Sequence, residues 1–451
     1  MKLIFLFLAT LLLAPSAVLR AAEGPAPKPN IIFILTDDQG YGDLGRHGHP
    51  LLKTPNLDAL HDQSVRFEQF YVSPSCSPTR AALLTGMHEF RNGVTHTTLP
   101  REHLNKDAVL LPQLLKSTGY RTGFVGKWHL GGEGSYAPDK RGFDWCSTNV
   151  GGPNVHFDPA MVRNGKRAPR KGYREDIFFD EAMAFMDECK DAPFFCYLAT
   201  YSPHAPLAAP EEFVAPFRGK VDKEEAAYLG MVANLDYNLG RLMKYLQARK
   251  LEDNTIIVFT SDNGGLLGVT NNAPLRVGKG SAYEGGVRVP LIICWPGVTK
   301  AGLVEATPAI TPDLYPTVLE LAGVKPLQSL VDGISLAPLL KSGAKPDRAE
   351  IFWHYPHYHP GGATPYSAVR SGDFRLVHFY EDGRDELYDL ANDVGETKDL
   401  AAAQPALAKT LRTRLDAWLK SVDAQLPTKN PAYDPAADAN QGKKNAKAKK
   451  K

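Results

Sequence analysis

An unbroken apolar strand is predicted by NIIFILTDD, residues 30–38, which ends in two carboxylates. A run with no alternation of apolar and polar residues is typical of a parallel strand that is covered on both faces. A second strand is predicted by TIIVFTSDNG, residues 255–264, which is built in the same way. Strands of this kind that alternate with amphipathic helices predict an α/β fold. We therefore expect a large, mostly parallel, doubly wound sheet flanked by helices.

Oxygen ligands follow both strands, as Asp37 and Asp38 after the first and Asp262 and Asn263 after the second. Ligands of open parallel sheets lie beyond the carboxyl ends of the strands, so these four side chains are expected to converge. Three carboxylates and an amide favour Ca²⁺ or Mg²⁺ over zinc. The competing interpretation is that Asp-Asp and Asp-Asn-Gly are ordinary turns or helix caps.

A third stretch, CSPTRAALLTG at residues 76–86, carries the most specific pattern of the chain. It resembles the signature of type I sulfatases, which belong to the alkaline phosphatase superfamily. The resemblance implies that Cys76 is oxidised to formylglycine (3-oxoalanine) by a formylglycine-generating or anaerobic sulfatase-maturating enzyme. The hydrated aldehyde would offer one hydroxyl to attack sulfur and a second to expel sulfate. The resemblance also favours one Ca²⁺ ion, with the modified Cys76 beside the four oxygen ligands.

Three further loops are similar to those of the family: GKWHLG at 126–131, SPHAP at 202–206 and GKGS at 278–281. Preorganised cations suit the charge that develops during hydrolysis of a sulfate ester. The resemblance implies that five further side chains are catalytic: Arg80, Lys127, His129, His204 and Lys279. His204 and Lys279 would protonate or stabilise the departing alkoxide, whereas His129 would accept the proton that lets sulfate leave.

The resemblance is loosest between residues 141 and 193. A side chain there that contacts sulfate is not assigned, although Ser147, Asn149 and Asn154 are available.

The segment HYPHYHPGG, residues 354–362, is dense in side chains that stack and form hydrogen bonds, which suits a sugar. His354, His357 and His359 are therefore candidates for substrate binding. Packing against the catalytic domain carries equal weight, and metal binding by the three histidines is a third interpretation.

Together these patterns predict a sulfuric ester hydrolase that acts on a sulfated carbohydrate. A phosphonate or phosphodiester hydrolase of the same superfamily is one alternative, because such enzymes share the modified nucleophile. A non-catalytic protein that binds sulfated glycans is another, and it requires an unmodified Cys76.

The domain organisation is read from composition and spacing. Residues 1–22 have the basic, apolar and small-residue regions of a secretory signal, so we expect a secreted or periplasmic protein. The catalytic domain is predicted over residues 23–345. A smaller domain with an antiparallel sheet and a C-terminal helix is predicted over residues 346–429, as the family has. Residues 430–451, rich in lysine, are predicted to be a disordered tail.

Individual elements follow from apolar spacing and turn residues. The predicted helices are 57–67, 79–85, 228–250 and 406–419. The predicted strands of the smaller domain are 367–370, 374–380 and 386–390. A membrane-spanning segment is not predicted.

The chain has a formal net charge of +2, and six lysines lie in the last 22 residues. The remaining body is slightly acidic, which argues against nucleic acid as a partner. Apart from Cys76, four cysteines could form at most two disulfides. Cys196 and Cys294 lie in apolar strands, where free thiols are at least as common.

Overall fold

The computed structural model describes residues 27–325 and 331–434. The predicted signal peptide, residues 1–22, lies outside the described residues, as do residues 435–451 of the predicted tail. In the part of the chain that is described, a helix long and apolar enough to cross a bilayer is absent. All five cysteines are described, and none forms a disulfide.

The large sheet has eleven strands among the described residues, in the order β10-β2-β9-β8-β1-β7-β3-β4-β5-β6, with β11 beside β2. Its centre is parallel, because β1 pairs in parallel with β7 and β8, and β7 pairs in parallel with β3. The strands are β1 (Asn30–Thr36), β2 (Val65–Tyr71), β3 (Arg121–Gly126), β4 (Trp145–Asn149), β5 (Ala160–Arg163), β6 (Lys166–Pro169), β7 (Phe194–Ala199), β8 (Thr255–Ser261), β9 (Arg288–Cys294), β10 (Leu303–Glu305) and β11 (Ala309–Ile310).

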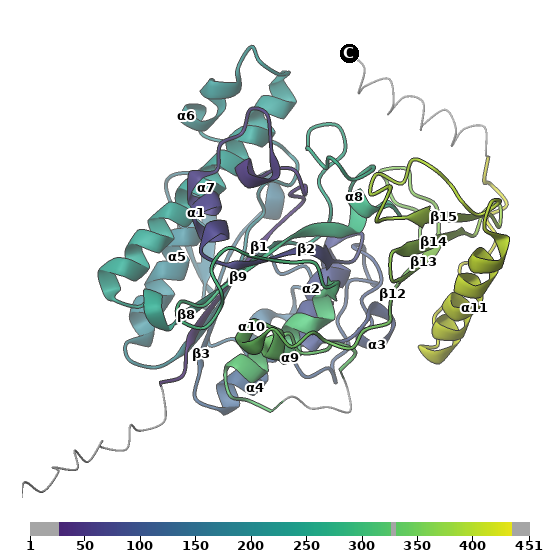
Figure 1. The fold of residues 1–451 in the computed structure, drawn as a ribbon. Coiled ribbons are helices and arrows are strands. Elements are labelled where there is room, and N and C mark those ends of the chain that lie inside the picture. The colour runs from purple at the N-terminus through teal and green to yellow at the C-terminus, as the bar shows by residue number, and fades with distance from the viewer. Residues whose placement is uncertain (1–26, 326–330, 435–451) are drawn as a thin grey trace, which may run out of the picture.

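Helices cover both faces of this sheet, as the sequence predicts (Figure 1). One face packs against α1 (Pro55–Asp62), α5 (Arg174–Cys189) and α7 (Lys223–Arg249). The other face packs against α2 (Cys76–Thr85), α4 (Leu111–Ser117), α9 (Leu314–Leu321) and α10 (Ala337–Ser342). The short helices are α3 (Glu89–Asn92), α6 (Glu211–Val214) and α8 (Glu284–Val287).

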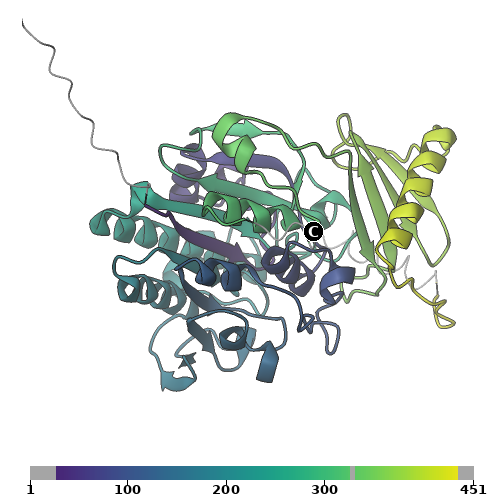
Figure 2. The same cartoon turned by 90° about the horizontal axis from the view of Figure 1, so that it is seen from below.

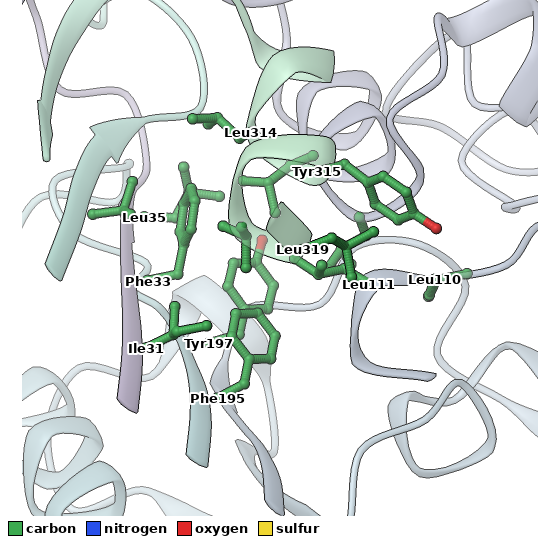
Figure 3. Packing of buried hydrophobic residues seen from close by; sticks show 14 of the residues in the cluster. Ile31, Phe33, Leu35, Leu110, Leu111, Phe195, Tyr197, Leu314, Tyr315 and Leu319 are labelled. Carbon is green, nitrogen blue, oxygen red and sulfur yellow. The ribbon is translucent and has the colours of Figure 1, made fainter. Parts of the chain in front are cut away.

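The central strand β1 supplies both cores, because its side chains alternate between the two faces. Ile32 and Ile34 enter the core beneath α5 and α7. Ile31, Phe33 and Leu35 enter the other core, and Figure 3 shows them facing the helix that carries Leu314 and Leu319. Burial on both faces explains why this strand reads as an unbroken apolar run.

The smaller sheet is antiparallel and has the order β12-β13-β14-β15. Its strands are β12 (Glu350–Tyr355), β13 (Tyr366–Ser371), β14 (Phe374–Phe379) and β15 (Asp385–Asp389). The helix α11 (Pro405–Ser421) covers its outer face, and the inner face packs on the main body (Figure 2). The sequence predicts three of these strands and the helix, but it misses β12.

The predicted helix 57–67 is wrong at its end. Helix α1 stops at Asp62, and strand β2 begins at Val65 and pairs antiparallel with β9. Within β2, Val65 and Phe67 are buried while Arg66 and Glu68 are partly exposed, an alternation that favours a strand. The predicted helix 228–250 begins earlier than expected, at Lys223. There the side chain of Asp222 accepts a hydrogen bond from the backbone N–H of Glu225 at 2.8 Å.

Candidate active site

Cys76 is the first residue of helix α2, and its side chain is almost fully buried. The loop before it is held by Thr79, whose hydroxyl accepts a hydrogen bond from the N–H of Ser73 at 2.9 Å. The first turn of a helix has unpaired N–H groups and a partial positive charge. The nucleophile candidate therefore lies at a point of positive potential.

The carboxylates lie where the central strands end. β1 and β8 pair in register from Asn30 opposite Thr255 to Thr36 opposite Ser261, so Asp37 and Asp262 leave the sheet at the same level. Asp38 then turns into the left-handed region, with φ of 68°, which is uncommon outside glycine. Its N–H donates to Oδ1 of Asp262 at 3.3 Å.

These side chains leave buried oxygens without partners. Asn263 donates its Nδ2 to Oδ1 of Asp38 at 2.7 Å, which turns its own Oδ1 away. Oδ1 of Asp37, Oδ2 of Asp38 and Oδ1 of Asn263 accept no hydrogen bond from the described residues. One ligand atom each from Asp37, Cys76 and Asp262 lies within 4.8 Å of the others. Unpaired buried oxygens are costly, and a hard cation bound among them would satisfy them.

Three cations face the three carboxylates. Arg80 donates Nε and Nη2 to Oδ2 of Asp262 at 3.0 and 2.6 Å. The Nζ of Lys127 lies 2.6 Å from Oδ2 of Asp37. The Nζ of Lys279 lies 2.6 Å from Oδ1 of Asp38 and 3.8 Å from Sγ of Cys76.

These charges shift the pKa values of the site. Burial alone would raise the pKa of the Cys76 thiol, but Lys127 and Lys279 outweigh it and hold the pKa well below its usual value. Burial also opposes ionisation of Asp37, but Lys127, His204, Arg80 and Lys279 together outweigh it and lower the pKa of that carboxyl. At Asp262, burial and the charge of Asp37 raise the pKa despite Arg80. A like charge beside a buried carboxylate has this effect.

His129 lies on the other side of the nucleophile and also has a left-handed backbone, with φ of 57°. Its Nε2 lies 3.4 Å from Oε2 of Glu102 and 3.3 Å from the carbonyl of Thr97. Burial and Lys127 would lower the pKa of this imidazole, but Cys76 and Glu102 outweigh them and raise it. A carboxylate on one ring nitrogen orients the other toward the chemistry.

His204 lies nearer the surface, with about a quarter of its side chain exposed. Its Nδ1 bonds with the carbonyl of Ala205, and its Nε2 lies 3.8 Å from Oδ2 of Asp38. A cavity of about 810 Å³ adjoins this loop. Residues 205–209 and Leu266, Leu267 and Val269 line it in part, so it opens beside the residues that follow His204 and Asn263.

The three histidines of the substrate segment lie in different surroundings. His354 belongs to β12, and both of its ring nitrogens are used there, by Oγ of Ser367 at 2.6 Å and the carbonyl of Gln425 at 3.0 Å. These contacts favour the interpretation that His354 packs within the fold. His357 bonds through Nε2 to Oγ1 of Thr95 at 3.2 Å, next to the loop that contacts His129.

His359 packs on Gly280, the neighbour of Lys279. A Cβ atom at this glycine would lie 2.3 Å from Nδ1 of the imidazole, and the glycine has φ of 81°. Glycine is therefore required there for two reasons. Burial and the charge of Lys279 lower the pKa of His359 to about 4, so the ring is neutral at pH 7.

Of the three polar residues in the unassigned region, two are engaged elsewhere. Ser147 donates to Oε2 of Glu181 at 3.1 Å, and Asn149 donates to the carbonyl of Gly152 at 2.8 Å. Glu102, which contacts His129, is not among the residues that the sequence predicts for the site. Glu102 lies in an irregular loop with no motif or periodicity, so no local signal could have identified it.

Two sequence families match the chain. The family described as "Sulfatase" matches residues 29–324, and "N-sulphoglucosamine sulphohydrolase, C-terminal" matches residues 277–425. The N-acetylgalactosamine-6-sulfatase of Mus musculus is 36% identical over 386 residues, covering 76% of this chain and 72% of the relative.

Two of the solved structures that resemble this chain cover most of its length. One is Ps i-CgsB in complex with k-i-k-neocarrahexaose, with a TM-score of 0.82, 33% identity and coverage of 93% of this chain and 98% of that one. The other is BT4656 in complex with its substrate D-glucosamine-2-N,6-O-disulfate, with a TM-score of 0.73, 26% identity and coverage of 89% and 99%.

Proposed function

The chain belongs to the sulfatase family and is a sulfuric ester hydrolase. We propose that it removes sulfate from a sulfated saccharide and that it uses formylglycine and a calcium ion to do so. The observation that carries the proposal is the position of Cys76. It begins a buried helix, beside two lysines and beside three buried oxygens that accept no hydrogen bond from the described chain.

The nucleophile is residue 76. When oxidised to formylglycine, this side chain supplies a hydrated aldehyde with one hydroxyl for attack and one for release. Pro78 and Arg80 stand at the spacing that the resemblance associates with this modification. The low pKa of the Cys76 thiol reflects the same cationic surroundings that would stabilise an oxyanion at this position.

Asp37, Asp38, Asp262 and Asn263 would hold a Ca²⁺ ion together with residue 76. The unpaired oxygens of three of them support this ligand set, and bound calcium would supply a Lewis acid that polarises a sulfate oxygen.

The remaining side chains bind the ester and move protons. Lys127 and Lys279 neutralise sulfate oxygens, since both ammonium groups lie at the site and Lys279 lies 3.8 Å from Sγ of Cys76. His129 accepts a proton at residue 76, because Glu102 stabilises its charged form. His204, on the side of the large cavity, donates a proton to the leaving alcohol, which must occupy the open side of the site.

A saccharide is the proposed leaving group. The names of the relatives support it, since they include N-acetylgalactosamine-6-sulfatase and a protein bound to k-i-k-neocarrahexaose. His357 and His359 lie beside the loops of His129 and Lys279 and are proposed to contact the sugar. We propose that the protein is secreted or periplasmic and that a formylglycine-generating or anaerobic sulfatase-maturating enzyme activates it.

The mass of the peptide that contains residue 76 tests the nucleophile, because conversion replaces CH₂SH by CHO and lowers the mass. Turnover is then measured as inorganic sulfate released from sulfated saccharides. The Cys76→Ala variant should lose at least about 10⁴-fold in turnover, since the nucleophile itself is removed. A Cys146→Ala variant, which changes a thiol outside the site, serves as the control.

The outcomes separate the alternatives. An unmodified Cys76 in protein that binds sulfated saccharides without releasing sulfate would support a non-catalytic binder. Faster turnover of a phosphate diester than of any sulfate ester would favour the phosphodiester alternative.

A further inference from the structure

A second cavity, of about 440 Å³, lies beside the active site on the side of the smaller sheet. Three segments form its walls: the loop that carries His96 and Arg101, residues 356–358 after β12, and residues 427–431 after α11. The cavity thus lies where the main body, the smaller sheet and the last described segment of the chain meet.

The walls carry positive charge. Arg101 and Lys429 are exposed, and within the described residues neither side chain has a hydrogen bond or ion pair. Acidic residues are absent from the described lining. Glu381 is near, but it accepts a hydrogen bond from the hydroxyl of Tyr358. The same hydroxyl accepts a hydrogen bond from Nδ2 of Asn430 at 2.9 Å, which attaches the C-terminal segment to the cavity wall.

Two imidazoles line the inner side. The ring of His96 stacks on Tyr355 with centroids 5.7 Å apart and meets His357 edge to face at 5.0 Å. Burial, together with His96 and Arg101, lowers the pKa of His357 to about 4, so this ring is neutral at pH 7. The imidazoles can donate hydrogen bonds, while Arg101 and Lys429 supply the charge.

The cavity is coupled to the active site through one loop. Adjacent residues of this loop face opposite ways, since Glu102 contacts His129 while Arg101 lines the cavity. His96 lines the cavity, and the carbonyl of the next residue, Thr97, lies 3.3 Å from Nε2 of His129. A molecule with its sulfate ester at residue 76 could therefore extend past His96 into the cavity.

We propose that this cavity binds a second anionic group of the same saccharide, an oxyanion on a sugar adjacent to the sulfate ester at residue 76. The inference rests on the proposed function, and it adds that the substrate carries at least two anionic groups. Arginine and lysine, together with neutral imidazole donors, are suited to sulfate or carboxylate oxygens. Residues 427–431 are accordingly part of the substrate site.

The test measures binding and does not depend on turnover. Full-length Cys76→Ala protein is titrated with sucrose octasulfate, whose charges are all sulfates, and with trigalacturonate, whose charges are all carboxylates. The same titrations are made after Arg101→Ala and Lys429→Ala are added together. A matched control adds Arg167→Ala and Lys300→Ala, which remove two exposed charges that line neither this cavity nor the site.

We expect the cavity variant to lose about tenfold or more in affinity for at least one probe, and the probe affected identifies sulfate or carboxylate. The control should change by less than about twofold, and Arg101→Lys with Lys429→Arg should restore most of the affinity. Equal losses in both double variants, no loss in either, or no binding of either probe would overturn the proposal. Failure of the proposed function is recorded separately, as a wild-type protein that releases no sulfate from any ester.

Discussion

Two clusters of buried charge differ in how their carboxylates are paired. The junction cluster, Glu284, Arg288, Arg375 and Glu396, joins the main body to the smaller sheet. Arg375 bonds to Oε1 of Glu284 at 3.0 Å and to Oε1 of Glu396 at 3.1 Å. Oε2 of Glu284 accepts from Tyr71 at 2.9 Å, and Oε2 of Glu396 accepts from the N–H of Glu284 at 2.7 Å. Every carboxylate oxygen of the junction cluster is therefore paired.

The catalytic cluster is formed by the three aspartates with Arg80, Lys127 and Lys279. It is equally buried, but some of its oxygens are not hydrogen-bonded within the described chain. One oxygen each of Asp37, Asp38 and Asn263 accepts no hydrogen bond from the described residues. Buried polar groups are almost always paired in proteins, so these unpaired oxygens support the proposed calcium ligand set. Burial of charge alone therefore does not distinguish a functional site. The catalytic cluster differs in that buried oxygens of three neighbouring side chains, Asp37, Asp38 and Asn263, accept no hydrogen bond from the described residues.

The largest effect is expected from breaking the catalytic cluster with Asp262→Asn. This change removes a carboxylate from the proposed calcium site, and it removes the charge that Arg80 contacts at 2.6 Å. Calcium content should fall to background, and turnover should fall by at least about 10²–10³-fold. Elemental analysis of the purified protein and a sulfate-release assay measure both.

Glu284→Gln is the matched control, because it alters a buried carboxylate of the junction cluster. It should keep its calcium. One bound zinc in the wild type, or normal calcium in Asp262→Asn, would contradict the ligand set.

A smaller effect, on stability instead of chemistry, is expected from Arg375→Met. Removing the shared guanidinium leaves the buried Glu396 without its cation and Glu284 with Arg288 alone, which costs about 3–5 kcal/mol of unfolding free energy. The measurement is a urea titration. Arg249→Met is the control, because Arg249 is about half exposed and its ion pair with Asp187 should contribute less than about 1 kcal/mol. Equal unfolding free energies of the two variants would show that the junction cluster does not stabilise the fold.

The sequence predicts the catalytic cluster far better than the junction cluster. Asp37 and Asp262 follow unbroken apolar strands, and strand order brings such ends together, so their convergence could be inferred from the pattern alone. Glu284 and Arg375 lie in segments with no shared pattern, and only the docking of the smaller sheet brings them together. Tertiary contacts of this kind leave no periodic signal.

Tertiary contacts also decide the end of the predicted helix 57–67 and the surroundings of His354. Residues 65–67 have apolar spacing compatible with a helix, but pairing with β9 makes them a strand. His354 lies in a segment rich in sugar-binding residue types, yet its ring nitrogens bond to Ser367 of the smaller sheet and to the carbonyl of Gln425 after α11. Composition identifies which residues can bind a ligand, whereas the tertiary contacts decide which remain available.

The smallest effect concerns the pH dependence of the junction cluster. Burial and the neighbouring Glu284 raise the pKa of Glu396 to about 7, although Arg375 opposes them. Because this pKa lies above the usual value of 4.5, the folded protein holds a proton that the unfolded chain has lost between about pH 4.5 and 7. The contribution of Glu396 to stability is therefore present at low pH and is lost as pH rises through this window.

Glu396→Gln should make the stability less dependent on pH, because the amide cannot lose the proton. We expect the unfolding free energy of the wild type to fall more than that of the variant between pH 4.5 and 8, by roughly 1–3 kcal/mol. The difference between the two proteins isolates this group from the other residues that titrate in the same range. Glu188→Gln, an exposed substitution on α5, should follow the wild type at every pH. Parallel curves for wild type and Glu396→Gln would mean that Glu396 is ionised throughout, and that Arg375 stabilises both carboxylates of the junction cluster in their charged form.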